Sequence, residues 1–185
     1  MTAPPRPGFS ARWTVFYAAV LGAVAVAAVF VRVNRTPSVR EGVYVRVPEW
    51  LARGEPGAGD LVTACAPEGA ATRLALRRGY LEPSGTCPSG AVPVLKRVVA
   101  TAGQTVEVRP DGVRVDGRAA PGGAGPPPTA DRRGRPLRPA YGTWRLGPGE
   151  LWLGSEIANG YDSRYFGPFG PDLLRGRARL AVPLD

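Results

Sequence analysis

The feature that most constrains this chain is an uninterrupted apolar run near its N-terminus. Residues 13–31 carry no charge and a single mildly polar side chain, Thr14, and an arginine stands at each end. About 20 apolar residues in an α-helix span the hydrocarbon core of a bilayer. We therefore expect residues 13–31 to form a transmembrane helix, with residues 1–12 as a cytoplasmic tail and residues 32–185 as an extracytoplasmic domain.

A cleavable signal peptide is the alternative interpretation of this run, because Arg6 and Arg12 precede it as a short basic region. The run is long for the apolar part of a signal peptide and is followed by no clear small-x-small cleavage site, which favours an uncleaved anchor. The orientation stays open. Arg32, Arg35 and Arg40 place more positive charge after the run than before it, against the usual cytoplasmic bias.

Beyond the apolar run the sequence predicts a mostly β domain. The chain has 25 glycines and 21 prolines, and in this part they separate short segments of alternating polarity. The expected strands cover residues 42–47, 60–65, 92–100, 105–109, 112–116, 142–145, 150–154 and 177–182. Alternation on both sides of Asp111-Gly112 predicts a β-hairpin. We expect a helix over residues 70–78 with Gly79 as its C-cap, a short turn at 48–53, and a long exposed loop at 118–139.

The formal net charge of +9 raises the question of nucleic-acid binding. The arginines are scattered, and neither a basic helix nor a stripe of arginines and aromatic residues is present in the sequence. We therefore expect no nucleic-acid partner, and interpret the charge as an arginine-rich surface close to anionic lipid.

Two cysteines, Cys65 and Cys87, lie in turn-rich sequence of the β domain. A disulfide between them would indicate an oxidising compartment and would stabilise the fold by about 3 kcal/mol. Two free buried thiols are the alternative, which the spacing does not exclude. We favour the disulfide, and with it an extracytoplasmic domain.

Lys96 is the only lysine of a chain that contains 23 arginines and no histidine. Without histidine, a Ser-His-Asp or Cys-His site is excluded. Strand alternation places Lys96 on one face with Val94 and Val98, an apolar setting that lowers the pKa of an ammonium group and makes it a usable base. Arginine remains protonated in proteins and offers no such base. Chance survival of one lysine in an arginine-biased composition is the alternative explanation.

Ser38 follows Thr36-Pro37 on a proline-stiffened turn just beyond the apolar run. A serine needs a base to become a nucleophile, and Lys96 is the base that this chain offers. The Thr36 hydroxyl, beside the backbone N–H of Ser38, could complete an oxyanion hole. By itself, a Thr-Pro-Ser sequence is usually only a turn.

A segment nearer the C-terminus, residues 154–168, is too specific in sequence for a generic loop. Together with Ser38, Lys96-Arg97 and residues 59–62, it resembles the ordered motifs of the bacterial type I signal peptidases. The resemblance is strongest to the TraF-type conjugative transfer peptidases, the compact members that process a pilin precursor. Its most specific part is Asp-Ser-Arg-Tyr-Phe-Gly at residues 162–167, and it extends over about three quarters of the chain.

The resemblance implies a signal-peptidase-like antiparallel β domain with one N-terminal transmembrane helix. It implies Ser38 as nucleophile, Lys96 as general base, and Thr36 with the Ser38 N–H as oxyanion donors. The supporting residues that it implies are Asp162, Ser163 and Arg164, with a buried Asp162–Arg164 pair, and Asp60 at the start of a core strand. It implies neither a cofactor nor a metal ion.

The chain also departs from the family pattern. Gly160 stands where signal peptidases usually place a serine that hydrogen-bonds the catalytic lysine. Ser155 and Glu156 replace the usual Asp-Asn, Val39-Arg40 lacks the common Met or Pro, and residues 102–104 replace a Pro-Gly-Asp turn. These differences argue against a housekeeping signal peptidase more than they argue against a Ser/Lys dyad.

The leading hypothesis is a serine endopeptidase anchored in the cytoplasmic (inner) membrane, with a periplasmic catalytic domain. The resemblance implies that it trims a conjugative pilin precursor and joins its ends, with the membrane and other conjugation or secretion components as partners. A general signal peptidase that cleaves exported preproteins is the first alternative. An inactive membrane-anchored scaffold of a secretion or pilus assembly is the second. A soluble Ser/Lys self-cleaving repressor is disfavoured, because the sequence shows no pair of DNA-binding helices.

Overall fold

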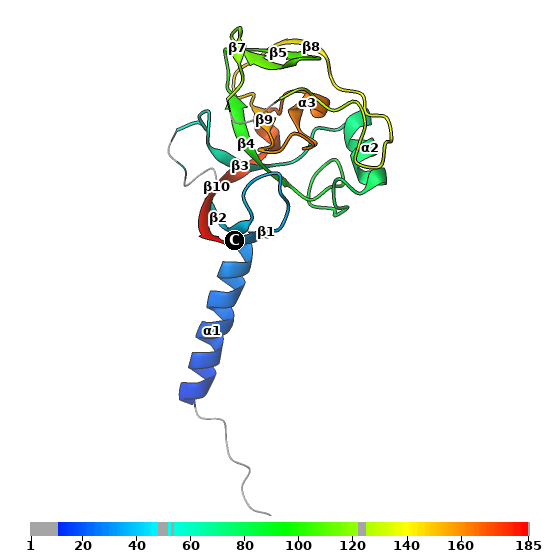
Figure 1. The fold of residues 1–185 in the computed structure, drawn as a ribbon. Coiled ribbons are helices and arrows are strands. Elements are labelled where there is room, and N and C mark those ends of the chain that lie inside the picture. The colour runs from blue at the N-terminus through cyan, green and yellow to red at the C-terminus, as the bar shows by residue number, and fades with distance from the viewer. Residues whose placement is uncertain (1–10, 48–51, 53, 122–124, 185) are drawn as a thin grey trace, which may run out of the picture.

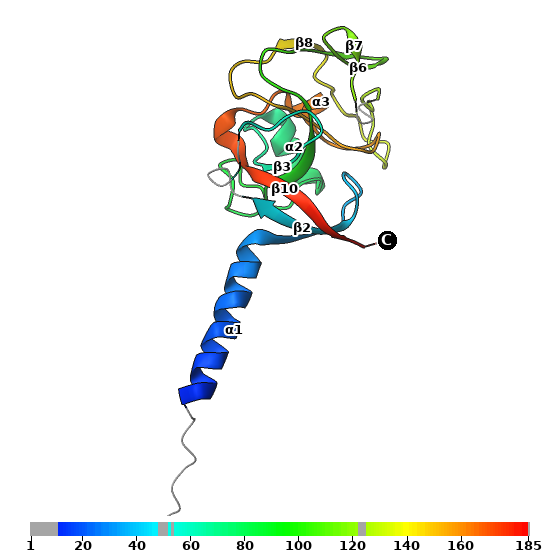
Figure 2. The same ribbon diagram turned by 90° about the vertical axis from the view of Figure 1, so that its left-hand side faces the viewer.

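The computed structural model describes residues 11–47, 52, 54–121 and 125–184. Helix α1 (Ala11–Phe30) extends away from a β-rich body (Figures 1 and 2). Within the described residues, no helix combines the length and the apolar character needed to cross a membrane. The helix ends one residue earlier than the predicted span, because Val31 already pairs with Val45 in the sheet.

The larger sheet forms the centre of the body. Its strands lie in the order β1-β2-β10-β3-β4-β9, and all neighbouring pairs are antiparallel. The strands are β1 (Val31–Asn34), β2 (Gly42–Val47), β3 (Leu61–Ala64), β4 (Val94–Ala100), β9 (Trp152–Gly154) and β10 (Leu174–Pro183). Because β4 pairs with β9, the strand that carries Lys96 lies beside the strand that leads into residues 154–168.

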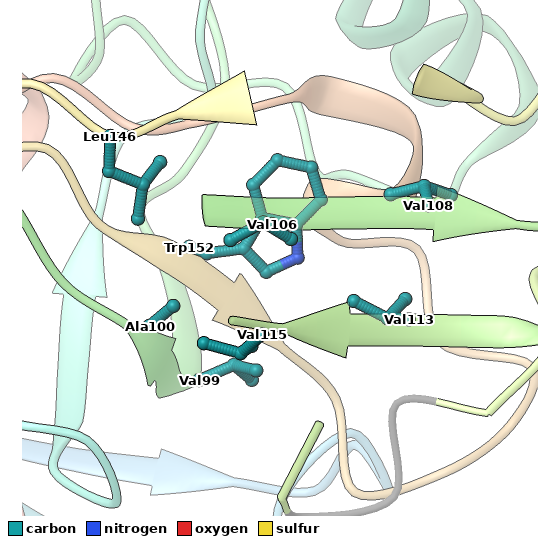
Figure 3. Close-up of a cluster of buried hydrophobic side chains, with 8 residues drawn as sticks. All are labelled: Val99, Ala100, Val106, Val108, Val113, Val115, Leu146 and Trp152. Carbon is teal, nitrogen blue, oxygen red and sulfur yellow. The ribbon is translucent and has the colours of Figure 1, made fainter. Parts of the chain in front are cut away.

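The smaller sheet has the order β7-β6-β5-β8 and packs on the larger one through a valine-rich cluster (Figure 3). Its strands are β5 (Thr105–Arg109), β6 (Gly112–Val115), β7 (Arg118–Ala119) and β8 (Gly142–Arg145). The cluster comprises Val99, Ala100, Val106, Val108, Val113, Val115, Leu146 and Trp152. Alternation along β5 and β6 turns one face of the hairpin inward, and each buried valine contributes roughly 1.5–3 kcal/mol.

Short helices complete the body. Helix α2 (Ala70–Arg78) ends at Gly79, whose left-handed conformation (φ 72°) lets its N–H cap the last carbonyls, so the predicted helix and cap are confirmed. Helix α3 (Ser163–Phe166) begins at the N-cap residue Asp162, and a 3₁₀ turn, η2 (Pro171–Leu173), precedes β10. Cys65 and Cys87 are joined by a disulfide in the structure.

The mostly antiparallel β architecture agrees with the prediction, and two differences stand out. β1 and β7 were not expected, because four- and two-residue strands carry too little alternation to be recognised. In the hairpin Arg109 pairs with Gly112, so the two loop residues are Pro110 and Asp111 rather than Asp111-Gly112. Proline suits the first central position of a turn because its φ is fixed. The turn expected at residues 48–53 lies almost wholly outside the described residues.

The long loop over residues 125–139 is mostly exposed, as expected, but it is tied to the body. Asp131 accepts hydrogen bonds from Tyr80 and Arg135, and its side chain is 8% exposed. The Tyr165 hydroxyl donates to the carbonyl of Pro128 at 2.7 Å. These contacts hold the loop against α2 and α3.

Candidate active site

Lys96 occupies the buried position that strand alternation predicts. It pairs with Val62 across the sheet and is 6% exposed, and its strand neighbours Val94 and Val98 pack in one hydrophobic cluster. Burial lowers the pKa of Lys96 from 10.5 to about 8; nearby Asp162 opposes this shift and Arg164 adds to it. A substantial fraction of this lysine is therefore neutral at mildly alkaline pH and can accept a proton.

Ser155 supplies the hydrogen-bond partner of this lysine. Lys96 Nζ donates to Ser155 Oγ at 2.8 Å, and Ser155 is itself fully buried. The backbone N–H of Ser155 donates to Asp162 Oδ2 at 3.0 Å, which fixes the start of the turn after β9. In the sequence, Ser155 stands out only as a departure from the family pattern. Its place at the end of a strand paired with β4 is the signal that could have revealed it.

Ser38 lies on the turn between β1 and β2, and Asn34 organises that turn. The Asn34 side-chain amide donates to the carbonyls of Thr36, Val39 and Arg40 at 2.9–3.2 Å. Its Oδ1 accepts from the backbone N–H of Thr36 at 3.2 Å, which is the pattern of an Asx-turn. Asn34 was not singled out from the sequence, although an asparagine two residues before Thr-Pro is typical of such a turn.

Thr36 lies beside the predicted nucleophile. Its Oγ1 is 3.1 Å from Ser38 Oγ and donates to Asn34 Oδ1 at 2.7 Å. In this arrangement the Thr36 proton is directed at Asn34, so Ser38 is the donor in the Ser38–Thr36 contact. An oxyanion role for Thr36 remains a prediction, and it requires the hydroxyl to turn away from Asn34.

Glu156 connects the turn that carries Ser38 to β4. Its backbone N–H donates to the carbonyl of Ser38 at 2.8 Å, and its Oε2 accepts from the N–H of Arg40 at 3.2 Å. The other carboxylate oxygen accepts from both Nε and Nη2 of Arg97, the residue after Lys96. Consecutive residues, Ser155 and Glu156, thus contact the lysine and the serine turn respectively.

The predicted supporting residues form one buried network. Asp162 and Arg164 make a two-point ion pair at 2.8 Å with both side chains almost fully buried. Arg164 also donates to the carbonyls of Ala158 and Gly160 at 3.0 Å, and Ser163 Oγ accepts from the backbone N–H of Leu153 at 2.9 Å. The network fixes the turn that holds Ser155.

Asp60 is placed away from this network. It directly precedes β3, and its Oδ2 accepts from the backbone N–H of Gly57 at 3.0 Å. Its own carbonyl accepts from the N–H of Val98 at 2.8 Å, so Asp60 helps to dock β3 against β4. Its structural contribution is to the strand beside Lys96 rather than to the lysine itself.

Ser38 and Lys96 line the same large cavity, of about 1160 Å³. In the part of the chain that the structure describes, no hydrogen bond joins their side chains, since Lys96 points its ammonium group at Ser155. The cavity wall is strongly cationic: it carries eight arginines, against Glu82 and Asp131 as its acidic residues. Asp131 is already neutralised by Arg78 and Arg135. The described residues contain no cluster of three or more His, Cys, Asp or Glu side chains suited to a metal ion.

Comparison with known proteins identifies the family of this chain. The family model described as "Signal peptidase, peptidase S26" matches residues 10–182. The chain belongs to the signal peptidase family S26. Within this family, it is 41% identical over 154 residues to a "Conjugal transfer protein TraF" of Agrobacterium fabrum, with 83% of each chain covered.

Other relatives of this S26 family member carry similar names. A "Probable conjugal transfer protein TraF" of Sinorhizobium fredii is 42% identical over 150 residues, covering 80% of this chain and 74% of the relative. A "Plasmid transfer protein TraF" of Escherichia coli is 38% identical over 168 residues, with 89% of each chain covered. The predicted resemblance to TraF-type signal peptidases is therefore confirmed.

Proposed function

We propose that this chain is a serine endopeptidase in which Ser38 is the nucleophile and Lys96 the general base. The observation that carries the proposal is the burial of the only lysine, with a lowered pKa, in the wall of the cavity that also contains Ser38. Membership of a peptidase family supports it.

In the proposed reaction, neutral Lys96 accepts the proton of the Ser38 hydroxyl as Ser38 attacks a peptide carbonyl. The step requires the Ser38 hydroxyl to turn towards Nζ of Lys96, which keeps its contact with Ser155. Lys96 then returns the proton to the leaving amine, and an acyl-enzyme remains on Ser38. Attack by water releases a shortened peptide, whereas attack by an amine forms a new peptide bond.

The substrate that we propose is a conjugative pilin precursor whose ends are joined after trimming, as the resemblance to TraF-type peptidases implies. The names of the relatives, conjugal and plasmid transfer proteins, support a role in conjugation. We also propose that the apolar run at residues 13–31 anchors the chain in the cytoplasmic membrane, with the β domain on the periplasmic side. The Cys65–Cys87 disulfide supports an oxidising compartment. A general signal peptidase is the second candidate, favoured by the description of the family model.

The test is co-expression with a candidate pilin precursor and with an exported preprotein, followed by mass spectrometry. Ser38→Ala and Lys96→Arg should each reduce precursor processing by at least about 10³-fold, because neither alanine nor a protonated guanidinium replaces its group. A processed pilin that is one water lighter than the linear product indicates joined ends. Normal processing by Lys96→Arg would refute the dyad, and cleavage of the preprotein alone would favour the second candidate.

A further inference from the structure

The Ser155 hydroxyl reaches Lys96 through space that exists because residue 160 is glycine. A Cβ placed on Gly160 would lie 2.1 Å from Ser155 Cβ and 2.2 Å from Ser155 Oγ. Both distances are far below a van der Waals contact, and the Cβ of Ser155 cannot swing aside as the tip of a long side chain can. A side chain at residue 160 and the observed position of Ser155 are therefore mutually exclusive.

Backbone strain does not explain this glycine. Its φ lies outside the left-handed region that favours glycine, in contrast to that of Gly167 at 77°. The requirement for glycine at residue 160 comes from the neighbouring side chain, Ser155, and not from the local conformation of the chain.

The Asp162–Arg164 ion pair fixes the positions of both Ser155 and Gly160. Asp162 Oδ2 accepts from the N–H of Ser155 at 3.0 Å, and Arg164 Nη2 donates to the carbonyl of Gly160 at 3.0 Å. Because Asp162 and Arg164 are themselves joined in a buried pair, the spacing between residues 155 and 160 is rigidly set. The hydroxyl at 155 is thereby held 2.8 Å from Lys96 Nζ.

We propose that Ser155 and Gly160 act as one positioning unit for Lys96, in which residue 155 supplies the hydroxyl and glycine at residue 160 leaves room for it. This inference rests on the proposed dyad. If it is correct, the hydroxyl that contacts Lys96 can be supplied from residue 155 or from residue 160. A Cβ on residue 160 would lie 2.2 Å from the present Ser155 Oγ, so a hydroxyl one bond further on can reach Lys96 once residue 155 is glycine.

Peptide cleavage by the full chain tests this exchange. Ser155→Ala should lower kcat about 10- to 100-fold with KM nearly unchanged, since Lys96 loses its orienting contact. Gly160→Ser should lower kcat at least as much, because its side chain displaces Ser155. The double variant Ser155→Gly/Gly160→Ser should regain most of the activity that Gly160→Ser loses. Ser89→Ala is the matched control, because the Ser89 hydroxyl has no hydrogen-bond partner among the described residues.

The single lysine allows a readout that is independent of catalysis. After labelling with ¹³Cε-lysine, the side-chain NMR signal comes from Lys96 alone, and its pH titration reports the protonation of that amine. Removing the oxygen that accepts from Nζ disfavours the ammonium form, so Ser155→Ala should move this titration to lower pH. The double variant should return it towards the wild-type position, and Ser89→Ala should leave it in place.

The proposal is overturned if Ser155→Ala keeps wild-type kcat and an unshifted lysine titration, or if the double variant is no more active than Gly160→Ser. Thermal unfolding of each variant shows whether it folds. If the double variant does not fold, Ser155→Ala alone tests the proposal. Ser155→Thr keeps a hydroxyl and should then retain more activity than Ser155→Ala. If Lys96→Arg remains active, the dyad itself fails. If Lys96→Arg is inactive and Ser155→Ala is normal, only the positioning unit fails.

Discussion

The backbone N–H of Glu156 donates a 2.8 Å hydrogen bond to the carbonyl oxygen of Ser38. This contact joins the turn after β9 to the turn after β1, which are distant in sequence. The Glu156 carboxylate adds a contact to the N–H of Arg40 and an ion pair with Arg97. Through these contacts, the position of the Ser38 turn depends on the same strand, β4, that carries Lys96.

Glu156→Ala should therefore lower kcat about 10-fold, because the carboxylate bridge from the N–H of Arg40 to Arg97 of β4 is lost, while the backbone contact to Ser38 remains. Glu156→Gln is the matched variant, since its amide oxygen still accepts from the N–H of Arg40. It should retain most of the activity. Steady-state cleavage of a fluorogenic peptide measures both, and an unchanged kcat in Glu156→Ala would remove Glu156 from the positioning of Ser38.

The pH dependence of activity follows from the pKa of Lys96, which burial lowers to about 8. A general base works in its neutral form, so kcat/KM should rise with pH and level off above about 8. The profile is measured with one peptide between pH 6 and roughly pH 10, beside a ¹³Cε-lysine titration of the same sample. A flat profile across the lysine titration would contradict a base role for Lys96.

The buried lysine should also reduce stability. Because its pKa is lower in the folded chain than in the unfolded chain, the unfolded state binds more protons between about pH 8 and 10.5, and stability rises with pH across that window. Lys96→Met should abolish activity and yet raise the free energy of unfolding at pH 7 by about 2 kcal/mol, after the loss of the Ser155 contact. Urea unfolding at pH 7 and pH 10 checks this, since the gain should shrink at the higher pH.

The Asp162–Arg164 pair should tolerate no conservative change. Arg164→Lys removes the two-point contact with Asp162 and the donors to the carbonyls of Ala158 and Gly160, and leaves a buried carboxylate poorly paired. We expect a loss of about 3–5 kcal/mol in thermal or urea unfolding. Arg145→Lys is a suitable control, because the Arg145 side chain is exposed and donates a hydrogen bond to the Thr105 hydroxyl at the surface.

The cationic cavity should select acidic peptides. Eight arginines line the cavity that holds Ser38 and Lys96, and the two acidic residues of its wall do not balance them. Peptides that carry Asp or Glu near the cleaved bond should have a lower KM than their Asn or Gln counterparts, and the difference should diminish as salt rises from about 0.05 to 0.5 M. Arg46→Gln and Arg175→Gln should weaken the preference. Equal KM values for both peptide series would show that the arginines of the cavity do not favour the binding of acidic peptides.

Much of the fold could be predicted from local pattern. Residues 42–47, 105–109 and 142–145 form strands with the expected ends, and residues 70–78 form the expected helix. These elements have either clear alternation or a glycine that ends them, and both signals act over a few residues. The short strand β1 was not predicted. It is stabilised by pairing with β2, and four residues are too few to show a recognisable alternation of polar and apolar side chains.

The candidate chemistry could be predicted from the chain alone: with no histidine and one lysine, Lys96 is the base that the sequence offers to Ser38. The resemblance to signal peptidases implied a buried Asp162–Arg164 pair, and the structure contains it. The group that holds the lysine became visible in the three-dimensional arrangement alone. Ser155 meets Lys96 because β9 pairs with β4, and it fits because Gly160 leaves its space empty. Such a contact depends on the register of strands and on the volume of a neighbouring side chain, which no short pattern in the chain records.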